Sequence, residues 1–155
     1  MTPPPTDRGR RGARVAVVVL AAATLLAFAA IVVAADRGAL PPLVSRLYAW
    51  PGGDKAGHVG LLAVLTFTLA LALRGRRVSL GPWTPPLAAV LAAAGITVEE
   101  ASQALFPGRT LSPLDLACSY LGVYLGARLA GALLARGSFR PVGGSGEHHP
   151  HARTP

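Results

Sequence analysis

The chain contains little charge, few aromatic residues and almost no cysteine. Only 14% of its 155 residues are charged and 6% are aromatic, whereas 52% are hydrophobic and the mean hydropathy is +0.46. A soluble domain normally carries about 25% charged residues. This composition therefore excludes a disordered chain and disfavours an ordinary water-soluble fold. The single cysteine, Cys118, excludes an intrachain disulfide.

The charge that is present is mostly basic. Fifteen Lys and Arg residues stand against seven Asp and Glu residues, which gives a net charge of +8. A basic protein can bind nucleic acid, but here the arginines separate apolar runs and do not line one helix face. That pattern is typical of membrane proteins, so we expect the lipid bilayer as a partner and no nucleic acid.

Four segments are predicted to cross the membrane, because a spanning helix needs about 20 mostly apolar residues. They are residues 15–35, 54–73, 84–105 and 112–135. The first is longer than the apolar core of a cleaved signal peptide, which has about 7–15 residues, so we expect it to be retained. Asp54 is the expected N-cap of the second helix and Thr84 of the third. Ser112 and Asp115 form a capping-box pattern at the start of the fourth.

The predicted fold class is an all-α, polytopic membrane protein with four transmembrane helices. Residues 1–14 form a basic N-terminal segment, residues 15–136 the membrane domain, and residues 137–155 a tail rich in Gly, Pro and Arg that we expect to be disordered. Three histidines in that tail lack partner ligands on a rigid element. No metal site and no cofactor are predicted.

The orientation follows from the Lys and Arg residues of the short loops. One side of the membrane receives ten of them: Arg8, Arg10, Arg11, Arg14, Arg74, Arg76, Arg77, Arg136, Arg140 and Arg153. The other side receives four: Arg37, Arg46, Lys55 and Arg109. Both termini are therefore expected in the cytoplasm of a multi-pass protein of the cell membrane.

The remaining polar residues are predicted to gather at the outer ends of the helices. Asp54 and His58 are four residues apart and share a helix face, as do Glu99 and Gln103. Carboxylates at membrane depth are costly and need a partner or water. The candidate ligand-binding residues are Asp54, Lys55, His58, Glu99, Glu100, Gln103, Arg109, Asp115 and Ser119. The same groups also fit a purely structural ion-pair cluster that ties the helix ends together.

One face of the predicted fourth helix carries an acidic residue at its outer end and small residues further along. Asp115, Ser119, Gly122 and Gly126 fall on one face. The two glycines form a small-xxx-small pair that permits close packing of another helix. Arg128 projects from the opposite face, and its guanidinium is expected to reach toward the headgroups.

Together these motifs resemble the VanZ-like family. The resemblance rests on Asp54-Lys55-x-x-His58, Glu99-Glu100-x-x-Gln103, Pro107-Gly108-Arg109, and Asp115 followed by Gly122. It covers about half of the chain. Ser119 replaces the asparagine of the family's last motif, and Glu99 stands where aspartate is frequent. The resemblance implies a bacterial envelope protein whose namesake is associated with resistance to glycopeptide antibiotics of the teicoplanin type.

Two functions remain open from the sequence. In the first, the polar cluster binds an envelope component, such as a cell-wall precursor, a surface polymer or another membrane protein. In the second, a membrane-embedded enzyme acts on a lipid-linked or cell-wall precursor with Glu100 or His58 as acid/base and Asp115 as a second acid. No nucleophile motif supports the enzyme. A transporter is disfavoured, because the inner halves of the helices are apolar.

Overall fold

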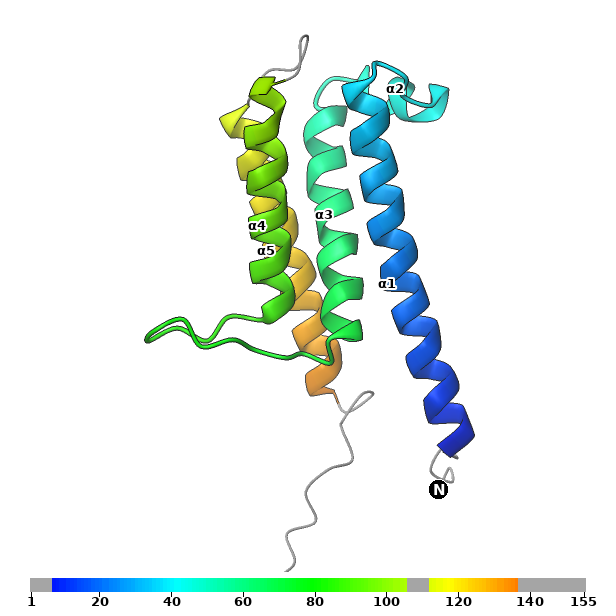
Figure 1. Ribbon diagram of the computed structural model, residues 1–155, viewed down its shortest axis with the longest axis vertical. Helices are drawn as coiled ribbons and strands as arrows, with labels where there is room; N and C mark the ends of the chain where they lie inside the picture. Colours follow the sequence, from blue (N-terminus) through cyan, green and yellow to red (C-terminus); the bar gives the residue numbers. More distant parts are fainter. Residues whose placement is uncertain (1–6, 106–111, 137–155) are drawn as a thin grey trace, which may run out of the picture.

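The computed structural model describes residues 7–105 and 112–136. In these ranges the chain forms five α-helices and one short 3₁₀ helix (Figure 1). They are α1 (Asp7–Asp36), α2 (Pro42–Tyr48), α3 (Gly53–Ala72), α4 (Leu87–Ser102), η1 (Gln103–Leu105) and α5 (Pro113–Ala135). The described chain contains no strand; only two isolated bridges occur, in the loop between α3 and α4. The all-α prediction is confirmed.

Three helices are long and apolar enough to cross a bilayer. The candidate spans are Arg11–Asp36, Gly53–Ala72 and Pro113–Ala135, in α1, α3 and α5. They lie side by side as a bundle, with α1 on the outer side of α3 (Figure 1). Only 6% of the apolar window of α1 is buried inside the molecule. Its exposed valines and leucines suit a lipid environment.

The centre of the bundle is the contact between α3 and α5, the most extensive in the molecule. A Cβ atom at Gly122 would lie 2.4 Å from the carbonyl oxygen of Val59, and one at Gly126 would lie 2.3 Å from that of Ala63. Neither position has room for a side chain, so the two backbones approach as closely as the small-xxx-small pair predicted. Arg128 is exposed, and the reach of its guanidinium toward the headgroups stays a prediction.

Helix α4 packs on both α3 and α5. Its Ile96 and Ala92 join Leu62, Leu65 and Val123 in one buried cluster. A second cluster lies toward the other end of the bundle and contains Ala70, Leu71, Ala88 and Ala130. Thr97 and Tyr120 add a hydroxyl–hydroxyl bond of 2.7 Å between α4 and α5. These contacts join α4 to α3 and α5 and form the core of the bundle.

Two predicted helix starts were wrong. The N-cap of α4 is Pro86, and Thr84 lies outside the helix, which begins at Leu87. The N-cap of α3 is Gly52 in the left-handed conformation, so Asp54 lies inside the first turn. By contrast, α5 begins as predicted, because the Ser112 side chain accepts a hydrogen bond from the Asp115 backbone N–H at 3.3 Å. Helix α1 starts earlier than residue 15, at Asp7.

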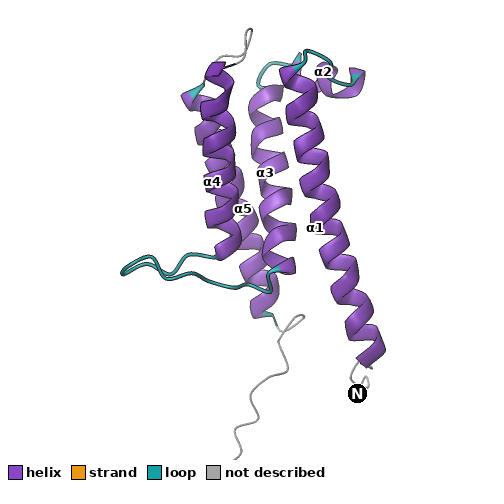
Figure 2. Cartoon of the chain, viewed as in Figure 1, coloured by secondary structure: helices purple, strands orange, loops and turns teal. Residues whose placement is uncertain are grey.

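The elements meet at two distinct ends (Figure 2). One end holds the end of α1, α2, the start of α3, η1 and the start of α5. We call it the polar end. The other end holds the start of α1, the α3–α4 loop and the end of α5, and it contains Arg74, Arg76, Arg77 and Arg136. We call it the arginine end. Among the described residues, the α3–α4 loop and the segment around α2, which the sequence assigned to opposite sides, therefore lie at opposite ends of the bundle.

Candidate functional site

Lys55 joins the beginnings of α3 and α5 at the polar end. Its ammonium nitrogen lies 2.8 Å from a carboxylate oxygen of Asp115 and also contacts the carboxylate of Asp54. The side chains of Lys55 and Asp115 are 34% and 20% exposed, so the pair is partly shielded from solvent. Two carboxylates on different helices thus share one ammonium group.

One turn further along α3, His58 reaches the same face of α5. Its Nδ1 atom lies 3.1 Å from the hydroxyl oxygen of Ser119, whose side chain is fully buried. His58 and Asp54 are neighbours on α3, and Ser119 and Asp115 are neighbours on α5. The predicted polar faces of the two helices therefore meet along their first two turns.

The acidic residues of α4 form a separate group. Gln103 donates hydrogen bonds from its side-chain amide to Glu99 at 3.0 Å and to Glu100 at 3.4 Å. Glu100 is only 1% exposed and accepts a further hydrogen bond of 2.6 Å from the backbone N–H of Ser112. Glu100 therefore connects the end of α4 to the residue that caps α5, across the segment between them.

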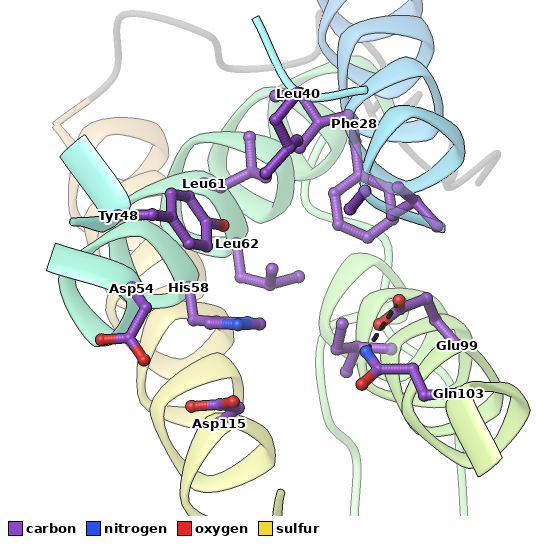
Figure 3. Close-up of a pocket in the computed structure, with 14 residues that line it drawn as sticks. Phe28, Leu40, Tyr48, Asp54, His58, Leu61, Leu62, Glu99, Gln103 and Asp115 are labelled. Atoms are coloured by element: carbon purple, nitrogen blue, oxygen red, sulfur yellow. Dashed lines mark hydrogen bonds between the residues drawn. The ribbon is translucent and has the colours of Figure 1, made fainter. Parts of the chain in front are cut away.

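A cavity of about 320 Å³ separates the two groups (Figure 3). Asp54, His58 and Asp115 lie on one side, and Glu99 and Gln103 lie on the other. The rest of its wall comes from α1, the α1–α2 linker, α2, α3 and α4. The apolar and aromatic lining residues are Phe28, Ile31, Val32, Ala35, Leu40, Tyr48, Leu61, Leu62 and Ile96. The result is a hollow with polar groups on two facing sides and apolar side chains along the rest of its wall.

The predicted site residues divide into three sets in the structure. Five of them line the cavity: Asp54, His58, Glu99, Gln103 and Asp115. Three others do not line the cavity but contact residues that do: Lys55 pairs with Asp115, Glu100 accepts a hydrogen bond from Gln103, and Ser119 contacts His58. Arg109 lies outside the described residues. The sequence predicted one pocket that contains all of these side chains, whereas the described part divides into two hydrogen-bonded groups that face each other across a hollow.

Two aromatic residues that line the cavity were not predicted as site residues from the sequence. Tyr48 of α2 lines the cavity and packs over Gly57, where an added Cβ would be 3.4 Å from the Tyr48 ring. Phe28 of α1 lines it from the opposite direction. Both occur in apolar stretches, where nothing in the sequence separates a cavity-lining aromatic from one that faces lipid.

Within residues 7–105 and 112–136, no group of three or more His, Cys, Asp or Glu side chains is arranged to hold a metal ion. The polar groups that line the cavity are three carboxyl groups, one amide, one imidazole and the hydroxyl of Tyr48. Comparison of the chain with protein-family models, with curated proteins and with solved structures gave no match.

Proposed function

We propose that the chain is a VanZ-like membrane protein of the bacterial cell envelope whose polar end binds an envelope component and thereby lowers susceptibility to glycopeptide antibiotics of the teicoplanin type. The observation that carries the proposal is the convergence of three motif segments, distant in sequence, around one cavity. Asp54 and His58 come from the first segment, Glu99 and Gln103 from the second, and Asp115 from the last.

The proposal includes an orientation, with the arginine end in the cytoplasm. Arg74, Arg76 and Arg77 lie in one short loop, and the positive-inside rule assigns such a loop to the cytoplasmic side. The polar end then faces outward, where cell-wall precursors, surface polymers and the outer parts of other membrane proteins are accessible. Both termini are cytoplasmic in this arrangement.

The proposal also includes α4 as a fourth span. The 16 residues of α4 cover about 24 Å, which alone is shorter than a hydrocarbon core of about 30 Å. The three residues of η1 continue it by about 6 Å, because a 3₁₀ helix rises about 2 Å per residue. Together they reach from the α3–α4 loop to the polar end.

The test is antibiotic susceptibility in a teicoplanin-susceptible bacterium that expresses the chain. We expect the wild-type protein to raise the inhibitory concentration of teicoplanin, and His58→Ala and Asp115→Asn to return it to that of cells without the protein. Arg46→Ala, at an exposed position of α2, serves as the control and should behave as wild type. If all variants are present in the membrane in equal amounts and protect as well as the wild type, the cavity has no part in resistance.

One contact favours the alternative, an enzyme acting on a lipid-linked or cell-wall precursor. His58 lines the cavity, and the contact of 3.1 Å between its Nδ1 atom and the buried Ser119 hydroxyl fixes the imidazole in a position to act as acid/base on a bound precursor. Purified protein would then convert such a precursor, and His58→Gln would abolish the conversion. Glu100→Gln tests the other acid/base candidate in the same assay. An unchanged precursor after prolonged incubation with wild-type protein would exclude the enzyme.

A further inference from the structure

A second hollow lies beside the polar cavity, at the level of the middle of the bundle. Its volume is about 450 Å³, and α1, α3 and α4 form its walls. The lining is almost wholly hydrocarbon and includes Val18, Leu25, Leu65, Leu69, Leu91 and Gly95. In a membrane this hollow faces the acyl chains of the bilayer, because its walls belong to the apolar stretches of α1 and α3.

The two hollows are adjacent, because Phe28 of α1, Leu62 of α3 and Ile96 of α4 line both of them. We call the two hollows together the groove. It follows α3 between α1 and α4, with its polar part at the end of the bundle and its apolar part further along. A ligand that fits it is amphiphilic, with a polar head of modest size attached to a hydrocarbon tail.

The polar lining indicates which headgroup fits. Asp54, Glu99 and Asp115 contribute carboxyl groups, whose oxygens accept hydrogen bonds when ionised. Lys55 offsets one of these three negative charges, so ionised carboxylates leave the lining negative and disfavour a phosphate, because like charges repel. His58 and Gln103 add groups that both donate and accept. Hydroxyl groups also donate and accept, so a sugar matches this mixed lining.

We propose that the groove binds a glycolipid, with an uncharged sugar in the polar cavity and its hydrocarbon tail between α1 and α4. This inference rests on the proposed function. It specifies the envelope component as a membrane-anchored sugar that enters the groove laterally from the outer leaflet. Moving a tail from lipid into an apolar groove gains little free energy, since both surroundings are apolar. Selectivity therefore comes from the hydrogen bonds to the sugar, and the groove sets the position of the lipid.

Glycines in the helices provide matched variants for the test. Gly95 lies on α4 at the edge of the apolar hollow, and a Cβ atom added there meets nothing within 4 Å. Gly95→Phe therefore places a ring in the groove without a clash in the core. Ala22→Phe is an exposed change on the α1 wall that blocks the groove independently. Gly60→Phe is the control, because Gly60 is exposed on α3 and also has nothing within 4 Å.

The probe is a glucosyl diacylglycerol with a photoreactive group in one acyl chain, mixed into phosphatidylcholine vesicles that contain the full chain. We expect photolabelling in the apolar hollow, found by mass spectrometry of peptides from α1 and α4. Excess unlabelled glucosyl lipid should compete, whereas phosphatidylglycerol and phosphatidylethanolamine should not. Gly95→Phe and Ala22→Phe should lose the labelling, and Gly60→Phe should keep it.

Several results would overturn the glycolipid assignment. These are equal labelling by phosphatidylglycerol or phosphatidylethanolamine probes, or labelling that persists in both groove-blocking variants. If Gly95→Phe and Ala22→Phe still protect cells from teicoplanin while His58→Ala does not, the polar cavity acts without the groove. The glycolipid proposal then fails and the proposed function stands. If His58→Ala protects as well as the wild type while photolabelling is as expected, the proposed function fails instead.

Discussion

At the scale of single residues, Lys55 holds the polar ends of α3 and α5 together. Lys55→Met leaves two carboxylates without their shared cation, and we expect a small fall in the free energy of unfolding, because solvent screens an ion pair whose lysine side chain is 34% exposed. The measurement is unfolding of the purified protein in detergent micelles. Adding Asp115→Asn should recover part of the loss, and strictly additive effects of the two changes would show that the ion pair contributes nothing.

Thr66 offers a second prediction at this scale. Its side chain is fully buried, and within the described residues its hydroxyl has no hydrogen-bond partner. Because a buried hydroxyl without a partner costs about 1–3 kcal/mol, we expect Thr66→Val to raise the free energy of unfolding. Thr68 is the matched control: it is also buried, but its hydroxyl donates to the carbonyl of Val64 at 2.9 Å. Thr68→Val should give no such gain, and equal effects at both positions would refute the argument.

At the scale of the helix, the glycine stripe of α5 determines how closely α3 can approach. Gly126→Ala places a Cβ atom 2.3 Å from the Ala63 carbonyl oxygen, so the helices must separate. We expect a loss of about 1–3 kcal/mol, as for other overpacked sites. Gly131→Ala, where nothing lies within 4 Å, should be neutral or stabilising because alanine favours the helix. Thermal unfolding of both variants in the same detergent is the measurement, and a Gly126→Ala protein as stable as wild type would contradict the close packing.

Helix periodicity predicted local features of this fold well. The capping of α5 by Ser112 and its buried stripe were both correct, because each depends only on neighbouring turns of one helix. The start of α4 was predicted wrongly because two prolines follow Thr84. A proline disfavours helical geometry for the residue before it, so Thr84 and Pro85 stay outside the helix, which begins at Leu87 with Pro86 as its N-cap.

The arrangement of the site could be predicted only in part. Spacing placed Asp54 with His58 on α3 and Glu99 with Gln103, and all four line the cavity, although Gln103 begins η1 and lies just beyond the end of α4. Spacing could not show that Glu100 turns inward to the Ser112 backbone while Glu99 lines the cavity. That choice depends on how α4 rotates against α5, which is fixed by contacts between residues distant in sequence.

At the scale of the whole molecule, charge and polarity divide the bundle lengthwise. The α3–α4 loop at one end contains Arg74, Arg76 and Arg77, and carboxyl groups gather at the other end. Arg37, Arg46 and Lys55 are the basic residues described near the polar end, and Lys55 is paired with two carboxylates there. A protein inserted by the positive-inside rule therefore presents its cavity to the outside.

This orientation can be tested with single cysteines in a Cys118→Ser background. A membrane-impermeant maleimide added to intact cells should label Ala49→Cys, which is exposed beside α2, but should label Ser79→Cys of the α3–α4 loop only after permeabilisation. Leu105→Cys tests the fourth span, because η1 ends there and its side chain is 81% exposed. If α4 crosses the membrane, Leu105→Cys is labelled from the same side as Ala49→Cys. Labelling of Leu105→Cys together with Ser79→Cys would mean that α4 does not cross, and outside labelling of Ser79→Cys alone would invert the molecule and place the cavity in the cytoplasm.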